Sequence, residues 1–375
     1  MKNIVVLGAG LVGKAMILDL YKSYKITAVD ISLDNLSGLN NLPNITTIVM
    51  DLSVSSNIKK IIKDADLVIG AVPGFMGFEM LRTVIESGKN IVDISFCPEN
   101  PLELDELAKS NGVTALVDCG VSPGMGNIIL GHYINEFDVS SYKCLVGGLP
   151  QKPEKPWGYK AVFSPIDVIE EYTRPVRYRV NGETLTEDAL FKSELVEFSS
   201  VGKFDAWYTD GLRTLLNTTN IPNLVELTIR YAKTIEPIIA LRDSGFFSSK
   251  EIDVKGKKVK PIDLTTNLMF SQWKMQPDEH DMTLMRIIIE GTKEGKDRKI
   301  EYDLVDYYDT KTETTSMART TGYTCTAAAN LLLENKYDKK GIIPPEVLGQ
   351  DETAYNYIIK YLADRGVVYN KNILL

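Results

Sequence analysis

Residues 2–13 read KNIVVLGAGLVG, an apolar run that passes directly into the pattern G-x-G-x-x-G. The run at 2–7 predicts a strand that is buried on both faces, as in a parallel sheet. In the glycine pattern, the first glycine permits a tight turn and the second lets backbone approach a pyrophosphate. The third glycine lets the next helix pack close to the strand, and that helix offers free N–H groups to phosphates. We therefore predict dinucleotide contacts at Gly8, Gly10, Leu11, Val12 and Gly13.

The next strand, expected at 26–29, is followed by Asp30. An acidic residue about twenty positions after the glycines accepts hydrogen bonds from the adenosine ribose. The same carboxylate would repel a 2′-phosphate, and no Arg or Lys occurs among residues 31–33. The sequence therefore predicts NAD as the cofactor instead of NADP. The alternative is an ordinary surface aspartate at a strand end.

Short apolar runs and helical patterns continue to alternate over the first 120 residues. This order predicts a doubly wound parallel sheet of the Rossmann type, with right-handed crossovers. Further strands are expected at 46–50, 67–69, 90–94 and 114–117, and helices at 11–23, 55–63, 79–87 and 102–110.

Ligands of open α/β sheets lie beyond the carboxyl ends of the strands, so residues at those ends are candidate contacts. Asp51 and Leu52 follow the third strand and are expected beside the adenine. The small residues after the fourth strand would let backbone run beside the nicotinamide ribose, unless they form a simple Pro-Gly turn. This second group consists of Ala71, Val72 and Pro73.

Four charged residues are candidates for the chemistry. Asp93 and Asp118 end two further strands near the expected nicotinamide, where a carboxylate binds an ammonium group or takes its proton. Each of them is equally suited to capping the following turn. Arg213 and Arg319 are candidates to clamp a substrate carboxylate, with a surface ion pair as the alternative for either.

Composition restricts the class of protein. A chain of 375 residues favours two domains. The net charge of −8 argues against nonspecific nucleic-acid binding, which needs a basic surface. No apolar run approaches the roughly 20 residues of a membrane span, and the first residues do not resemble a signal peptide. Four cysteines without a CxxC pair, and two histidines, predict free thiols in the cytosol and no metal site.

After about residue 120 the pattern changes to consecutive β-like segments, which suggests an antiparallel sheet. Residues 147–157 (GGLPQKPEKPW) are rich in Pro, Gly and Lys, so we expect neither a helix nor a central strand there. The segments 284–290 and 299–304 flank a charged loop and predict a hairpin. A helix is expected at 321–334.

At this point the chain resembles the saccharopine reductase-like oxidoreductases, with the lysine 6-dehydrogenase branch as the nearest likeness. The segments that carry the resemblance follow one another along nearly the whole chain. They are GAGLVG at 8–13, GAVPGF at 70–75, VDISFCPENPLELDE at 92–106, VDCGVSPGMGNI at 117–128, VGGLP at 146–150, FSPIDVIEEYTRPVR at 163–177, DGLR at 210–213, LRDSGFF at 241–247, MARTTGY at 317–323 and GIIPPE at 341–346.

The resemblance implies a Rossmann domain at 1–122, an inserted α+β substrate and oligomerisation domain at 123–316, and C-terminal helices at 317–375 that return to the Rossmann domain. It also implies NAD-dependent oxidative deamination of the 6-amino group of L-lysine, a small-molecule amino-acid substrate and a homo-oligomer. No nucleic acid or membrane partner is expected.

The resemblance has one departure and leaves two alternatives open. Relatives usually continue with Pro-Gly-His after residue 231, whereas this chain has Ala232-Lys233-Thr234, so Thr234 replaces a histidine. One alternative is a saccharopine-type reductase that joins an amine to a keto acid. The other is an NAD-binding regulatory or scaffold protein that has lost turnover.

Overall fold

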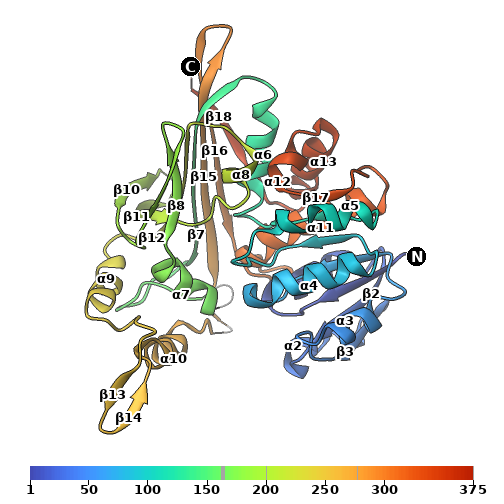
Figure 1. The fold of residues 1–375 in the computed structure, drawn as a ribbon, viewed down its shortest axis with the longest axis horizontal. Coiled ribbons are helices and arrows are strands. Elements are labelled where there is room, and N and C mark those ends of the chain that lie inside the picture. Colours follow the sequence, from blue (N-terminus) through green and yellow to red (C-terminus); the bar gives the residue numbers. More distant parts are fainter. Residues whose placement is uncertain (162–164, 200, 277, 375) are drawn as a thin grey trace.

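A parallel sheet forms the first lobe of the molecule (Figure 1). The computed structural model describes residues 1–161, 165–199, 201–276 and 278–374. All neighbouring strands of this sheet run parallel, which confirms the doubly wound prediction. In spatial order the strands are β17 (Gly341–Ile343), β6 (Thr114–Leu116), β5 (Ile91–Asp93), β4 (Leu67–Gly70), β1 (Asn3–Leu7), β2 (Lys25–Asp30) and β3 (Ile45–Val49).

Helices cover this sheet much as the sequence predicts, with shifted ends. The helix expected at 79–87 begins at Gly74, because Pro73 precedes it with a backbone that suits a helix start. Only the second half of the helix expected at 102–110 is α-helical, after a 3₁₀ turn at Pro101–Leu104. The helices are α1 (Leu11–Leu20), α2 (Leu33–Leu36), α3 (Ser55–Ile61), α4 (Gly74–Glu86) and α5 (Asp105–Ser110).

The second lobe is a mixed sheet. Its strands are antiparallel except for β7 and β12, which pair in parallel. Along its main path the order is β10 (Ser193–Phe198), β11 (Gly202–Thr209), β12 (Asn223–Tyr231), β7 (Asp138–Pro150), β15 (Asp281–Lys293), β16 (Lys296–Tyr307) and β18 (Asn370–Leu374); β8 (Val176–Val180) pairs with β12 and with β9 (Glu183–Glu187).

The central strand β7 corrects one prediction. Residues 147–150 were expected to lie outside any central strand, yet they complete β7 between β12 and β15. A Cβ on Gly147 would lie 2.5 Å from the carbonyl oxygen of Ile229. The glycine therefore permits a close approach of two strands, a role that glycine also has inside sheets. Its presence was misread as a sign of a loop.

The remaining helices join the lobes or cover the second sheet. The helix expected at 321–334 begins five residues earlier, because both carboxylate oxygens of Asp281 accept N–H groups of its first turn, from Ser316 and Met317. The predicted hairpin is confirmed as β15 and β16. The helices are α6 (Met125–Ile134), α7 (Pro165–Thr173), α8 (Leu215–Thr218), α9 (Ile235–Asp243), α10 (Pro261–Trp273), α11 (Ser316–Leu333), α12 (Pro345–Gly349) and α13 (Glu352–Ala363), and β13 (Ile252–Val254) pairs with β14 (Lys257–Val259).

The chain returns to both lobes after residue 316. Helix α11 packs against α1, and β17 adds a strand to the first sheet. Strand β18, by contrast, pairs with β16 in the second sheet. Among the described helices, none has the length and apolar character to cross a membrane.

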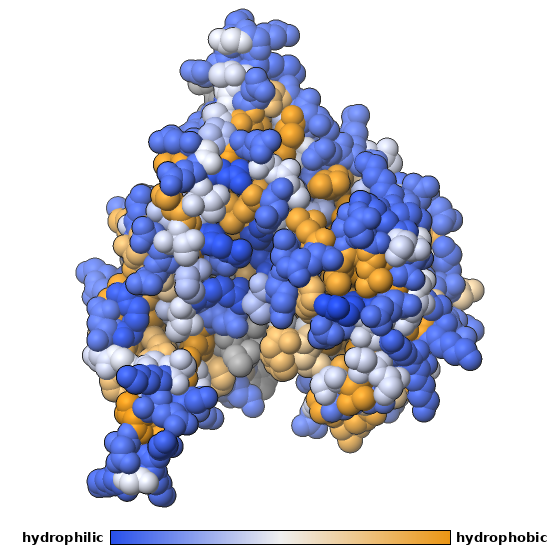
Figure 2. Space-filling model, viewed as in Figure 1, coloured by the Kyte–Doolittle hydropathy of each residue, from blue (hydrophilic) through white to orange (hydrophobic). Residues whose placement is uncertain are grey.

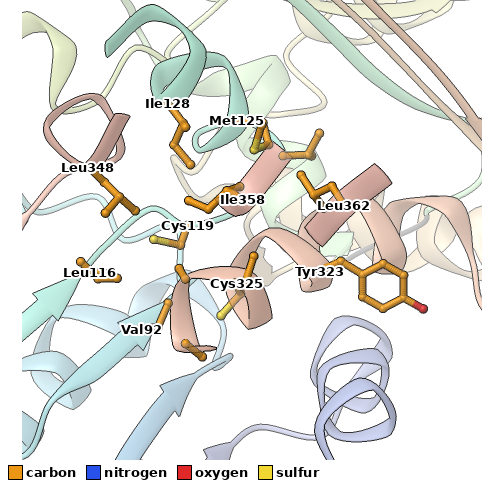
Figure 3. Packing of buried hydrophobic residues seen from close by; sticks show 14 of the residues in the cluster. Val92, Leu116, Cys119, Met125, Ile128, Tyr323, Cys325, Leu348, Ile358 and Leu362 are labelled. Carbon is orange, nitrogen blue, oxygen red and sulfur yellow. The ribbon is translucent and has the colours of Figure 1, made fainter. Parts of the chain in front are cut away.

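One apolar core connects the two lobes (Figure 3). It is fully buried at most positions, and each large side chain buried in this way contributes about 1.5–3 kcal/mol. Because α6, α11 and α13 all enter it, the two sheets are held by shared packing. Figure 3 labels Val92, Leu116, Cys119, Met125, Ile128, Tyr323, Cys325, Leu348, Ile358 and Leu362 from this core.

Candidate active site

A cavity of about 780 Å³ lies between the two lobes. One wall consists of the carboxyl ends of β1 to β6 and the segments that follow them, together with residues of α11, and the other comes from α7, β7, β11 and β12. In Figure 1, α7 of the second lobe faces α4 of the first. The surface in Figure 2 is hollowed at the lower edge of the molecule between the lobes. The cavity is therefore placed where ligands of open α/β sheets bind.

The glycine turn has the geometry that a dinucleotide site needs. A Cβ on Gly8 would lie 2.3 Å from the carbonyl oxygen of Ala71, and one on Gly13 would lie 2.1 Å from that of Gly8. At Gly10, by contrast, a Cβ would meet no protein atom within 4 Å. No side chain caps the N-terminus of α1. Its N–H groups therefore suit a pyrophosphate approaching over Gly10.

Asp30 is tied into the same turn. Its Oδ2 accepts a hydrogen bond from the backbone N–H of Ala9 at 2.8 Å, and its Oδ1 accepts one from that of Ser32 at 2.8 Å. These contacts hold the carboxylate at the cavity wall, although the residue is buried. The structure brings all predicted cofactor residues to this one cavity: Gly8, Gly10, Leu11, Val12, Gly13, Asp30, Asp51, Leu52, Ala71, Val72 and Pro73.

Asp93, Asp118 and Arg213 lie behind the cavity wall. The guanidinium of Arg213 pairs with Asp118, with N···O distances of 3.2 and 3.3 Å, and also donates to the carbonyl of Cys97. Asp93 accepts a hydrogen bond from the hydroxyl of Ser95 at 2.8 Å, and burial raises the pKa of Asp93 to about 7. None of the three is among the described residues that line the cavity. Asp118 and Arg213 pair with each other, and Asp93 bonds to Ser95.

Arg319 lies on α11 and also faces away from the cavity. Its guanidinium donates to the carbonyls of Tyr307 and Arg365 and lies 3.5 Å from Asp306. The ion-pair alternatives for Arg213 and Arg319 therefore describe the contacts that the structure shows, but both pairs are buried and not on the surface. The sequence-based choice of catalytic residues thus finds no support in the cavity lining.

Sequence reasoning missed the polar face of β12. Glu226, Thr228 and Arg230 alternate with apolar residues along this strand, and all three line the cavity. Period-two alternation places them on one face of the sheet. The signal was present in NLVELTIRY at 223–231, where a buried strand carries polar residues at every second position.

Glu226 is the most unusual of these groups. It is 6% exposed, and its Oε2 accepts a hydrogen bond from the hydroxyl of Ser122 at 2.8 Å. A Cβ on Gly211 would lie 1.5 Å from Oε1, so the glycine leaves space for the carboxyl group. Burial raises the pKa of Glu226 to about 7, against the opposing effect of the Ser122 hydrogen bond. A carboxyl group that titrates near neutrality suits proton transfer.

The other charged groups of this wall occur in ion pairs. Arg230 lies 2.5 Å from Glu171 of α7, with its guanidinium 4.2 Å from the centre of the Tyr159 ring. Arg174 pairs with Glu170, also on or next to α7. Asp210 pairs with Arg177, which is not among the described lining residues, at 2.8 Å. An ion pair on the wall matches the two opposite charges of an amino-acid head group.

Thr234, the departure from the resemblance, lies behind Arg230. It lines a separate small cavity together with Arg230 and a group of aromatic residues. Its hydroxyl donates to the carbonyl of Tyr231 at 2.7 Å. The residue is not among the described residues that line the large cavity.

The described residues contain no cluster of His, Cys, Asp and Glu arranged to hold a metal ion. All four cysteines are free and buried, as predicted. Burial raises the pKa of Cys97 to about 11, so this thiol is protonated at neutral pH.

Comparison with known proteins gives consistent matches along the chain. Residues 4–116 match the saccharopine dehydrogenase NADP binding domain, and residues 120–367 match the saccharopine dehydrogenase C-terminal domain. The saccharopine dehydrogenase (NADP(+), L-glutamate-forming) of Schizosaccharomyces pombe is 22% identical, over 100% of this chain and 99% of that protein. The alpha-aminoadipic semialdehyde synthase of Arabidopsis thaliana is 23% identical over 82% of this chain, which spans 37% of that relative.

A solved structure shows the same fold. Apo saccharopine dehydrogenase (L-Glu forming) from Saccharomyces cerevisiae superposes with a TM-score of 0.82, covering 100% of both chains at 20% identity. At this identity the likeness shows the fold alone.

Proposed function

Because the chain belongs to the saccharopine dehydrogenase family, we propose that it oxidises a primary amine of a diamino monocarboxylic acid with NAD. L-Lysine, oxidised at its 6-amino group, is the leading candidate. The family makes the protein an amino-acid oxidoreductase with a pyridine-nucleotide domain. The substrate and the choice of NAD are our proposal.

The charge of the cavity wall is the observation that supports the proposed substrate class. Among the described lining residues beyond the nucleotide turn, the cationic side chains are Arg174 and Arg230, and each already pairs with a glutamate. Saccharopine would bring three carboxylates to this wall, whereas lysine brings one carboxylate and two ammonium groups. Burying an unpaired carboxylate is costly. The acidic residues of the wall therefore favour a diamino substrate: Glu170, Glu171, Asp210 and Glu226.

The chain's own residues divide the work as follows. The Arg230–Glu171 pair holds the α-carboxylate and α-ammonium of the substrate, because each charge of the pair meets an opposite charge. Glu226 accepts the proton of the reacting ammonium, since hydride leaves the carbon only when its nitrogen has a free electron pair. NAD, contacted at its pyrophosphate by the glycine turn and at its adenosine ribose by Asp30, would supply the hydride acceptor. Water then adds to the substrate imine and releases an aldehyde and ammonium.

The choice of NAD is supported by the adenine end of the cavity. Asp30 lines it, and the described lining residues around Asp30 include no Lys or Arg: they are Ile31, Asn35, Asp51 and Leu52. A 2′-phosphate would therefore find a carboxylate and no cation. This proposal departs from the saccharopine dehydrogenases among the relatives, whose names specify NADP(+).

A saccharopine-type reaction is the second candidate, favoured by the names of the relatives. The third candidate, a scaffold without turnover, is disfavoured by Glu226. Burial of a carboxyl group with a pKa of about 7 at a cavity wall costs stability, and a catalytic role explains why the group is there.

For the protein as a whole we also propose the domain division at 122 and 316, a cytosolic location in keeping with its free thiols, and a homo-oligomer.

Absorbance of the reduced nucleotide separates the candidates. Purified protein with NAD is assayed with L-lysine, L-ornithine, saccharopine and a monoamino acid as control. We expect reduction of NAD with a diamino acid and little with saccharopine. Oxidation of NADH only with an amine plus a keto acid would support the saccharopine-type reaction. No turnover with any substrate, while NAD still raises the melting temperature, would support the scaffold.

A further inference from the structure

The contact between Ser122 and Glu226 crosses from one lobe to the other. Ser122 lies in the segment between β6 and α6, at the carboxyl edge of the first sheet, whereas Glu226 lies on β12 of the second sheet. Both residues line the cavity. The Ser122 hydroxyl donates to Oε2 of Glu226 at 2.8 Å, and its oxygen also lies 3.8 Å from the sulfur of Cys144.

We propose that Ser122 is a positioning residue for the reaction: its hydroxyl keeps the Glu226 carboxylate oriented and ionised, ready to accept the substrate proton. The inference rests on the proposed function, which makes Glu226 the proton acceptor. The hydrogen bond also couples that acceptor to the docking of the two lobes, because its donor and acceptor belong to different sheets.

The surroundings of Glu226 explain why one hydroxyl matters. Asp210 follows β11, Glu171 comes from α7 and Asp118 follows β6, and all three carboxylates disfavour a further negative charge. Cys144 of β7, the register partner of Glu226, is a neutral thiol because burial raises its pKa. Arg230, four residues along the same face of β12, already pairs with Glu171.

Against burial and these neighbours, the Ser122 hydrogen bond is the contact that favours the ionised form of Glu226. A hydrogen bond to a charged group is stronger than one between neutral groups, so the loss of this one changes the protonation state of Glu226 at neutral pH. Gly211 completes the arrangement, because a side chain there would overlap with Oε1 and turn the carboxyl group away from Ser122. The position of the carboxylate is thus fixed from two sides.

The test is the pH dependence of kcat/KM for S122A and S122C. Cysteine is close to serine in size but is a weaker donor, so it weakens the hydrogen bond without leaving a gap. The wild-type rate should rise through pH 7 as Glu226 ionises. We expect the midpoint of this rise to move up by about one pH unit in both variants, so that the rate well below the midpoint falls about tenfold. At alkaline pH the rate should be largely retained, and S122T should restore the wild-type midpoint.

A control separates this role from general disturbance of the cavity. Thr228 also lines the cavity, but its hydroxyl bonds to Thr209 at 3.0 Å and not to Glu226. T228V should leave the midpoint of the pH profile unchanged, even if it changes the value of kcat/KM. If S122A and S122C lower the rate equally at all pH values, with no movement of the midpoint, Ser122 has only a structural role and the proposal is wrong.

A substrate-free measurement keeps this proposal separate from the proposed function. In protein labelled with 13C at the glutamate carboxyl carbon, the Glu226 signal is assigned as the one absent from E226Q. Its titration midpoint should rise by about one pH unit in S122A. A rise without turnover on any diamino acid would overturn the proposed function but retain the Ser122–Glu226 coupling. An unchanged midpoint would overturn the coupling, even in an active enzyme.

Discussion

The two ends of the cavity are built in different ways. At the nucleotide end, the contacts come from a few short segments at strand ends, and glycine backbone defines the shape. At the substrate end, Glu226, Ser122, Glu171 and Gly211 come from β12, the β6–α6 segment, α7 and the segment after β11. The first site follows from local sequence, whereas the second exists only after the two lobes have packed together. Substitutions at the two ends of the cavity should therefore have different effects.

The largest effect is expected at the substrate end. E226Q keeps the shape of the side chain but cannot accept a proton, so kcat should fall about 10²- to 10⁴-fold. The dissociation constant of NAD, measured by calorimetry, should stay the same. E183Q, at an exposed glutamate of β9, is the matched control and should remain fully active. Near-normal turnover by E226Q would mean that another group accepts the proton.

This contrast also explains what the sequence could predict. The parallel sheet and the glycine turn were predictable because each depends on residues close together in the chain. The N-terminus of α11 was not, because its first N–H groups bind Asp281, which precedes them by 35 and 36 residues. Asp93 and Asp118 were chosen because they lie at strand ends. A local sequence pattern does not reveal that Arg213 forms an ion pair with Asp118.

The next effect concerns the nucleotide end. D30N keeps the size of the side chain and removes its charge, so the repulsion of a 2′-phosphate should weaken. We expect the ratio of kcat/KM for NADP to that for NAD to rise about tenfold or more, which corresponds to 1.4 kcal/mol per factor of ten. D51N removes the charge of an exposed aspartate at the same end of the cavity, and it is the variant with which D30N is compared. A wild-type enzyme that already prefers NADP would overturn the assignment of Asp30.

Two glycines should respond differently. G10A places a methyl group in open space, so the variant should fold normally but bind NAD about tenfold more weakly, because the methyl group meets the nucleotide. In G13A the methyl group would overlap with the carbonyl of Gly8, so we expect a loss of about 1–3 kcal/mol in unfolding free energy as well. Chemical denaturation and NAD titration of both variants provide the measurement. Equal loss of stability in the two would contradict this account of the turn.

The last effect is on the pH dependence of the free energy of unfolding. Burial raises the folded-state pKa of Glu226 above its unfolded value of about 4.3, so the folded protein binds the proton more tightly. The associated stability is fully present below the unfolded value and is lost as pH rises through about 7. E226Q should therefore gain about 1–3 kcal/mol relative to the wild type between pH 5 and pH 8. A constant difference over this range would contradict the raised pKa.

The most direct test of the central claim is the ammonium released for each NADH formed when L-lysine is the substrate. Oxidative deamination releases one ammonium per NADH, and we predict this ratio, with glutamate absent from the products. A protein that forms reduced nucleotide only from saccharopine, with glutamate as the product and no ammonium, would contradict the proposed substrate class.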